Sequence, residues 1–298
     1  MKKSAGFIVM LGISMVTVLS ACQKKEVADG SNETVAVQET QTQEKKAPYK
    51  VKVEELKIEN GDNTIYGKVY YPDVEGKFPA IIMSHGYNGA NTDFVAEGQY
   101  YATNGYVAYA FDFCGGSGKS KSTGDTTEMS VMTEKSDVIA IFNYFTKMDK
   151  VDEDKIFLFG GSQGGLVTAL ATEELGEKVA GMALYFPAFN IPDDWRKTYP
   201  TVESIPETVD FWGMCLGRKF IEDIHDLQVF NVVGEYSNNV LILQGDKDMI
   251  VPMSYAQEAQ KKYPHAELIV MEGEGHGFTP AGATKARQYV LDFMNENK

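Results

Sequence analysis

The chain has 298 residues, 43% of them hydrophobic and 23% charged, a composition typical of a folded globular protein of one large or two small domains. The formal net charge of -14 argues against nucleic acid as a partner, because so acidic a surface repels phosphates. A simpler meaning of this acidity is solubility.

A signal for export is predicted by the first residues, MKKSAGFIVMLGISMVTVLSAC. Lys2 and Lys3 precede an apolar stretch that is shorter than a membrane-spanning helix usually requires. The ending LSAC resembles the lipobox of bacterial lipoproteins, which implies that residues 1–21 are removed and that Cys22 carries a lipid such as palmitate. The alternative is a signal peptide cut elsewhere, next to an incidental cysteine. With the lipobox, we expect an exported protein anchored at the extracytoplasmic face of the cell membrane.

Residues 22–48 hold few large apolar side chains and no aromatic ones. Such a segment cannot bury enough apolar surface to offset the entropy that is lost on ordering. We therefore expect residues 22–48 to be a flexible tether between the lipid anchor and a catalytic domain at residues 49–298.

Short apolar runs and amphipathic segments alternate along this domain. The first two runs, residues 51–58 and 63–72, alternate as half-exposed antiparallel strands do. Denser runs, typical of strands buried on both faces, follow at residues 78–86, 105–113, 155–161, 179–187, 239–246 and 266–273. Helical periods occupy residues 127–148, 163–175, 253–263 and 284–297. This order predicts an α/β fold, a mostly parallel sheet with helices on both faces.

Residues 188–236 interrupt the alternation. They hold three of the ten prolines and both tryptophans, and they are far more numerous than an ordinary connection between strands needs. We expect an inserted cap that acts as a lid over a site. The alternative is a structural excursion that only covers the edge of the sheet.

A strand, a tight turn and a helix are predicted around Gly160-Gly161-Ser162-Gln163-Gly164. The pattern G-x-S-x-G in this setting is typical of a nucleophilic serine presented on a strained turn, where glycines let strand and helix pass closely. The helix N-terminus behind Ser162 also favours developing negative charge.

A serine hydroxyl needs a base, and the chain has four histidines from which to choose. His276 follows the last predicted strand and precedes the last helix, where the base for this kind of serine is expected. The other three histidines fit this role less well. We expect His85 to pack behind its loop, while His225 falls within the insertion and His265 lies in a surface-like stretch.

A carboxylate must then orient the imidazole, and the two candidates, Asp246 and Asp248, lie at the end of the run at residues 239–246 and just after it. We predict Asp248 for this role and an Asx-type turn for Asp246. The oxyanion of the tetrahedral intermediate needs two donors, for which we predict the backbone N–H groups of Gln163 and Tyr87.

Two cysteines remain in the predicted domain, Cys114 and Cys215, and free thiols are as compatible with their spacing as a disulfide. The chain has neither a CxxC nor an HExxH motif, so we predict no metal and no organic cofactor.

The domain carries the motifs SHGYNGAN, YAFDFCGGSGKS, GGSQGG, LYFPAF, LQGDKDMIVP and EGEGHGF. Through them the chain, from about Val51 to its end, resembles the α/β-hydrolase superfamily, and within it the bacterial cinnamoyl (feruloyl) esterases and related carboxylesterases. This resemblance implies a cap between two late strands and places an acidic ligand for the phenolic ring at Asp194. It also places Phe220, which has no hydroxyl, where relatives carry a ring-binding tyrosine, and Gly161 where relatives often carry histidine.

The leading hypothesis is a serine carboxylesterase that cleaves short-acyl or hydroxycinnamoyl esters, small or linked to a polysaccharide, through Ser162, Asp248 and His276. A serine peptidase of the same fold is the first alternative, with Asp193 and Asp194 available to hold a substrate amine. A lipoprotein that binds a ligand without catalysis is the second, although such proteins usually lack one of these three residues.

Overall fold

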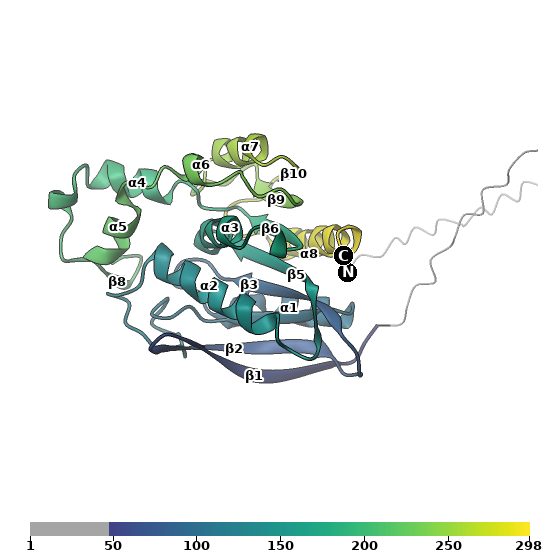
Figure 1. Ribbon diagram of the computed structural model, residues 1–298. Helices are drawn as coiled ribbons and strands as arrows, with labels where there is room; N and C mark the ends of the chain where they lie inside the picture. The colour runs from purple at the N-terminus through teal and green to yellow at the C-terminus, as the bar shows by residue number, and fades with distance from the viewer. Residues whose placement is uncertain (1–47) are drawn as a thin grey trace, which may run out of the picture. The chain divides into compact units, whose positions relative to one another are not determined.

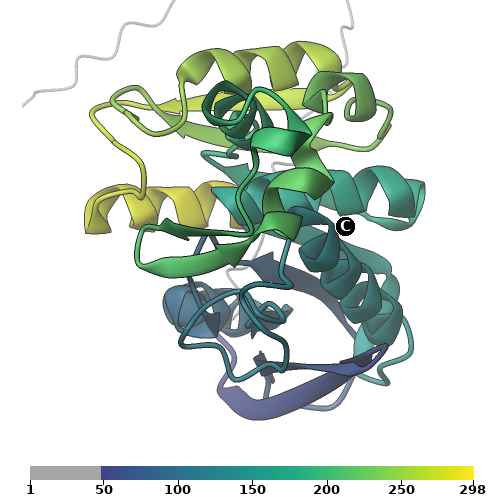
Figure 2. The same ribbon diagram turned by 90° about the vertical axis from the view of Figure 1, so that its left-hand side faces the viewer.

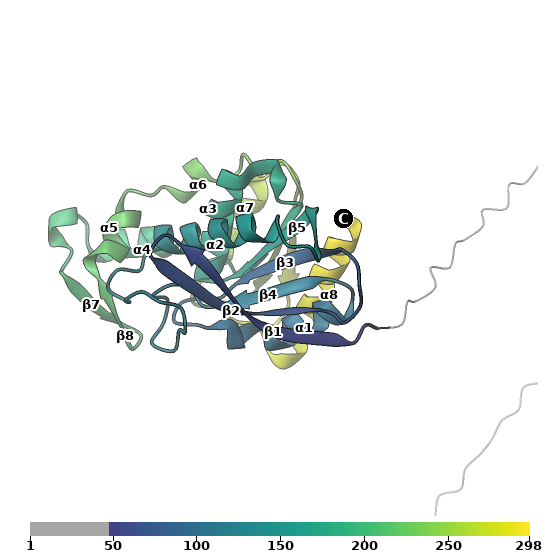
Figure 3. The same cartoon turned by 60° about the horizontal axis from the view of Figure 1, so that its bottom comes forward.

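The computed structural model describes residues 48–298, whose main element is an eight-stranded sheet (Figure 1). The strand order is β1-β2-β4-β3-β5-β6-β9-β10, and Figure 3 shows the first four strands side by side. β2 pairs antiparallel with β1 and with β4, and the other neighbours are parallel. The mostly parallel sheet predicted from the sequence is therefore confirmed. The strands are β1 (Val51–Asn60), β2 (Asn63–Pro72), β3 (Phe78–Ser84), β4 (Val107–Phe111), β5 (Val151–Gly161), β6 (Gly181–Tyr185), β9 (Val240–Gly245) and β10 (Ala266–Met271).

Helices cover both faces of the sheet. On one face α2 and α3 pack against each other, with α7 beside β9 and β10, and on the other lie α1 and α8. Successive side chains of a strand pack on opposite faces of the sheet. In β3, Ala80 and Ile82 pack on the face covered by α2 and α3, whereas Ile81 and Met83 pack on the face covered by α1 and α8. The helices are α1 (Val95–Thr103), α2 (Val131–Phe145), α3 (Gln163–Leu175), α7 (Met253–Lys262) and α8 (Pro280–Glu296).

The insertion between β6 and β9 forms a cap at one end of the sheet. In Figure 1, α4, α5 and β8 lie to the left of the sheet and α6 lies at the top beside α7; the cap comes to the front in Figure 2. It includes a two-stranded hairpin of its own, and α4 packs on α5. The cap consists of α4 (Ile191–Thr198), a short 3-10 turn (Val202–Ser204), β7 (Thr208–Phe211), β8 (Met214–Gly217), α5 (Arg218–His225) and α6 (Val229–Val232).

The last strand differs from its prediction. β10 is an edge strand that pairs only with β9, and Val270 on it is 50% exposed. The run at 266–273 was expected to be buried on both faces, but an edge position leaves part of a strand in solvent whatever its composition.

Helix α1 is a second difference, because no helix was predicted there. The segment contains Gly98, and its apolar residues follow the helical period only weakly. Gly98 is required by packing: a Cβ at this position would lie 2.6 Å from the ring of Tyr70. Helix α2 also begins later than predicted, since the hydroxyl of Ser130 caps it by accepting from the N–H of Thr133.

The predicted signal peptide, the lipid site Cys22 and nearly all of the tether fall outside the described residues. Within residues 48–298, none of the helices combines the length and the apolar character that crossing a membrane requires.

Candidate active site

Ser162 occupies a strained turn between β5 and α3. Its φ of 54° and ψ of -121° are values that residues other than glycine rarely adopt. Its neighbours have no room for side chains: a Cβ on Gly160 would collide with the carbonyl oxygen of Gly164, and one on Gly164 would collide with the carbonyl oxygens of Ser84 and His85. Glycines at these two positions therefore let the chain turn sharply and leave the Ser162 side chain facing the cavity described below.

Ser162, His276 and Asp248 form a continuous chain of hydrogen-bonding atoms. Nε2 of His276 lies 2.9 Å from Oγ of Ser162, and Nδ1 of His276 lies 2.9 Å from Oδ2 of Asp248. The three residues follow β5, β10 and β9, and the carboxyl ends of parallel strands meet at the same edge of a sheet. This arrangement is able to pass a proton from the hydroxyl to the imidazole while the carboxylate stabilises the resulting cation.

The carboxylate of Asp248 is fully buried and held from both sides. Its Oδ1 accepts hydrogen bonds from the N–H groups of Ile250 (2.8 Å) and Val251 (2.9 Å). Its Oδ2 accepts from Nε2 of Gln244 at 2.9 Å as well as from the imidazole of His276. These contacts hold the carboxylate in the orientation that presents it to Nδ1 of the imidazole.

Two backbone N–H groups beside Ser162 have no protein acceptor. Gln163 is the first residue of α3, and neither its N–H nor that of Tyr87 donates a hydrogen bond within residues 48–298. The loop that carries Tyr87 approaches the serine closely, since a Cβ on Gly86 would lie 3.2 Å from Cβ of Ser162. The predicted oxyanion donors thus flank the same serine and are both available to a ligand.

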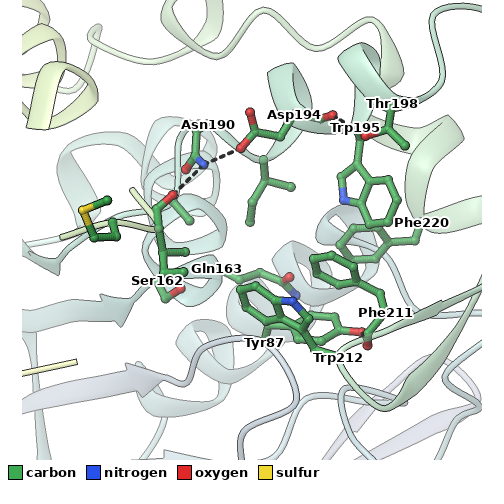
Figure 4. Close-up of a pocket in the computed structure, with 14 residues that line it drawn as sticks. Tyr87, Ser162, Gln163, Asn190, Asp194, Trp195, Thr198, Phe211, Trp212 and Phe220 are labelled. Carbon is green, nitrogen blue, oxygen red and sulfur yellow. Dashed lines mark hydrogen bonds between the residues drawn. The ribbon is translucent and has the colours of Figure 1, made fainter. Parts of the chain in front are cut away.

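A cavity of about 270 Å³ opens beside Ser162, between the sheet and the cap (Figure 4). Tyr87 and Gln163 line it from the sheet side, and Figure 4 shows aromatic rings from the cap opposite Ser162. The wall is mostly apolar, with a few polar groups near the serine, as in sites for small organic ligands. The aromatic residues that line it are Tyr87, Trp195, Phe211, Trp212 and Phe220.

Asp194 and Phe220, the two cap positions where the resemblance implies contact with a phenolic ring, both line this cavity. Phe220 is almost completely buried, and it lies against Trp195 with ring centroids 6.1 Å apart. Asp194 accepts a hydrogen bond of 2.6 Å from Nδ2 of Asn190, and Figure 4 places Asn190 between Ser162 and Asp194.

Asp193 does not line the cavity, contrary to its predicted availability for a substrate amine. Its Oδ1 pairs with the guanidinium of Arg196, and its Oδ2 accepts a hydrogen bond of 2.6 Å from the hydroxyl of Tyr255 on α7. Adjacent residues on a helix point about 100° apart, so Asp193 turns toward α7 while Asp194 lies along the cavity wall. Asp194 is therefore the carboxylate of this pair that a ligand can meet.

His85 packs behind the loop after β3 that carries Tyr87, as the sequence predicts. Its ring is 1% exposed, with Nδ1 2.7 Å from the carbonyl oxygen of Gly86 and Nε2 accepting from the N–H of Phe113. Burial lowers the pKa of the imidazole, and the neutral tautomer with a proton on Nδ1 satisfies both bonds.

Asp246 does not form the predicted Asx-type turn. Its Oδ1 instead accepts a hydrogen bond of 2.6 Å from the N–H of Gly273 in the loop after β10. β9 and β10 are parallel neighbours, so their following loops lie together, a proximity that the local sequence does not reveal.

Several residues of the site could not be identified from the sequence. Gln244 orients Asp248, and Phe186, whose φ is 37°, packs its ring 4.7 Å from the ring of His276. Neither position carries a recognisable motif. Glu134, which accepts a hydrogen bond from the side-chain amide of Gln163, could have been noticed in the sequence. It is a charged residue on the otherwise apolar face of α2, between Val131 and Val138.

The part of the chain that the structure describes holds no group of three or more His, Cys, Asp or Glu side chains placed to bind a metal ion. Its two cysteines are free thiols, Cys114 buried and Cys215 exposed.

Comparison with known proteins identifies both a family and a fold. The model of the prolyl oligopeptidase family matches residues 92–298. The chain is 25% identical over 167 residues to "Uncharacterized peptidase YtmA" of Bacillus subtilis, an alignment that covers 55% of this chain and 62% of that relative.

Solved structures similar to this chain are α/β hydrolases. Est1E from Butyrivibrio proteoclasticus, in a structure with ferulic acid bound, gives a TM-score of 0.74 at 25% identity, covering 81% of this chain and 98% of Est1E. The α/β hydrolase GrgF from Penicillium gives a TM-score of 0.66 at 17% identity, covering 83% and 99%. The resemblance to the α/β-hydrolase superfamily, including its esterase-like members, is confirmed.

Proposed function

This chain belongs to the prolyl oligopeptidase family of α/β hydrolases, and within that fold we propose that it is a serine carboxylesterase acting on short-acyl or hydroxycinnamoyl (feruloyl-type) esters. The observation that carries the proposal is the chain of contacts from Ser162 through His276 to the buried Asp248, at the mouth of an aromatic cavity. A nucleophile, its base, the group that orients the base and two free N–H donors are all present around one point.

In the proposed reaction, Oγ of Ser162 attacks the ester carbonyl carbon while Nε2 of His276 takes the hydroxyl proton. The resulting oxyanion lies between the N–H groups of Tyr87 and Gln163, and Asp248 stabilises the imidazolium. Collapse of the intermediate releases the alcohol, which receives its proton from His276. Water then attacks the acyl-enzyme by the same steps and releases the acid.

The cavity supports an aromatic acyl group as one class of substrate. Its walls offer several rings for stacking, and Asp194 can accept a hydrogen bond from a phenolic hydroxyl. Ferulic acid is bound in the solved structure of Est1E, which has a similar fold. Phe220 cannot donate to such a hydroxyl, so binding here would depend on stacking and on Asp194.

A serine peptidase is the second candidate, and it is favoured by the family itself and by the relative described as a peptidase. Peptide cleavage would use the same nucleophile and base. A substrate ammonium group would meet Asp194, which lines the cavity where Asp193 does not, and it would compete there with Lys197, whose Nζ lies 3.0 Å from Oδ1 of Asp194. A protein that only binds its ligand is less well supported, because no reacting group is missing from the site.

The decisive experiment compares wild type with Ser162→Ala for labelling by a fluorophosphonate and for hydrolysis of nitrophenyl acetate, methyl ferulate and aminoacyl anilides. We expect the variant to lose labelling and at least about a thousandfold of its ester hydrolysis, because the nucleophile is gone. Ser237→Ala, which changes an exposed serine on the surface, is the matched control. If Ser162→Ala hydrolyses esters at the wild-type rate, the proposal is wrong. If the wild-type protein cleaves aminoacyl anilides in preference to esters, the peptidase is favoured.

We further propose that the protein is an exported lipoprotein, held at the cell membrane through Cys22 and a tether of residues 22–48. Support comes from the apolar run and the LSAC sequence at its end.

A further inference from the structure

A buried carboxyl group lies directly behind the proposed oxyanion site. Glu134 is 1% exposed and belongs to the face of α2 that packs on α3. Its Oε2 accepts a hydrogen bond of 2.7 Å from the side-chain amide of Gln163. Because the N–H of Gln163 is one of the two proposed donors beside Ser162, Glu134 holds a residue of the oxyanion site in place.

The surroundings of Glu134 offer it no balancing cation. Within residues 48–298 it forms no ion pair, and β1, β3 and β5 present apolar side chains to this face of α2. The titratable groups named for Glu134 and for the residues after β3 are acidic, phenolic or neutral: Asp137 on α2, and Tyr87 and His85. Cations of the helices packed nearby are paired, Lys135 with Glu174, Lys219 with Asp223 and Arg218 with Glu222, and Lys57 of β1 is exposed to solvent.

Burial therefore raises the pKa of the Glu134 carboxyl to about 8, an effect that the hydrogen bond from Gln163 opposes and the charge of Asp137 increases. The group is mostly protonated at neutral pH and ionises just above it. Burial, and after it the charge of Glu134, also raises the pKa of the Tyr87 hydroxyl. The residues on both sides of the oxyanion site thus lie within the field of this one carboxyl group.

We propose that Glu134 is a positioning residue that holds Gln163 while uncharged, and that its ionisation at alkaline pH slows attack by Ser162. This inference rests on the proposed function, since it concerns the same nucleophile and the same donors. Attack creates a negative charge on the substrate oxygen, and a second negative charge fixed behind the donors opposes it. The protonated side chain accepts the same hydrogen bond from Gln163 without that repulsion.

The test is the pH dependence of kcat for the full chain with nitrophenyl acetate, which is uncharged, using Ser162→Ala as the blank. We expect the wild-type kcat to fall about tenfold between about pH 7 and about pH 9.5, through the ionisation of Glu134. Glu134→Gln keeps an acceptor for Gln163 and cannot ionise, so its kcat should stay level over this range. Melting curves at each pH separate a loss of activity from unfolding.

Gln163→Met is the second variant, and it tests the inference even if Glu134→Gln does not fold. It keeps the backbone N–H but removes the hydrogen bond that lowers the pKa of Glu134, so the fall in kcat should move to higher pH. An unmoved fall in this variant, a fall of the same size in Glu134→Gln, or a level wild-type profile would each overturn the inference.

The same design separates this inference from the proposed esterase function. If no ester is cleaved but a fluorophosphonate labels Ser162, the substrate proposal fails, and the labelling rate is measured against pH instead. That rate should fall in wild type and stay level in Glu134→Gln, because phosphonylation places negative charge at the same donors. Absence of both hydrolysis and labelling contradicts both proposals.

Discussion

Trp212 adopts a backbone conformation that bulky residues rarely tolerate. It forms, with Gly213, the two-residue turn between β7 and β8, and the φ values of the two are 45° and 80°. Such turns favour glycine and asparagine. The indole is 62% exposed, lines the cavity and stacks on Phe211 at 4.8 Å. From this strained position in the cavity wall we infer that the indole contacts the substrate.

We therefore predict that Trp212→Gly and Trp212→Ala differ in stability but weaken substrate binding alike. Glycine should be more stable than alanine at this position by about 1 kcal/mol, because only glycine adopts a positive φ without strain. Both variants should raise KM for methyl ferulate several-fold and leave nitrophenyl acetate little changed. Urea unfolding and steady-state kinetics measure the two effects. Equal stability of the glycine and alanine variants would argue against strain, and an unchanged KM against contact with the aromatic substrate.

At the scale of elements, Asp193 is one of several groups that connect the cap to the body of the protein. Asp193 on α4 pairs with Arg196 on the same helix, whose guanidinium also donates to the carbonyl oxygen of His225 at the end of α5. The hydroxyl of Tyr255 on α7 donates to the other oxygen of Asp193. Two cap helices are thereby connected to a helix that packs on the sheet.

Tyr255→Phe should loosen the cap without disturbing the nucleophile. Removing one hydrogen bond to a carboxylate should destabilise the protein by about 1 kcal/mol. We expect faster limited proteolysis within residues 188–236 and a higher KM for methyl ferulate, with unchanged fluorophosphonate labelling of Ser162. Tyr289→Phe, which alters an exposed tyrosine on α8, is the control. If both variants are cleaved at the same rate, the bond between Tyr255 and Asp193 does not restrain the cap.

The sheet and most of its helices could be predicted because their signals are local. Alternating runs identified β1 and β2, and dense apolar runs identified the other six strands of the main sheet. The helical periods identified all of the helices on its faces except α1. The exposure of β10 could not be predicted, because it depends on which strand lies at the edge. Asp246 and Asp193 were misjudged for a similar reason: their partners, Gly273 and Tyr255, lie on other elements.

For the whole molecule, attachment to a membrane is the property that the first residues predict. Radiolabelled palmitate should appear on the wild-type protein and be absent from Cys22→Ala, because the thiol at the expected cleavage site is the acceptor in the lipobox interpretation. Wild type should sediment with membranes and the variant should be released. Cys215→Ala, which removes an exposed thiol of the described domain, is the matched control. Equal labelling of Cys22→Ala and wild type would refute the anchor.

The sequence by itself determined the α/β class and singled out Ser162, His276 and Asp248, because the glycine spacing, the small number of histidines and the chain order are all local or countable features. Only the tertiary structure decided that these three side chains meet at hydrogen-bonding distance, and that Asp194 rather than Asp193 lines the cavity. It also placed Glu134 behind Gln163. The physical reason is that distance, burial and the electrostatic effect of a neighbour are set by packing between elements far apart in the chain.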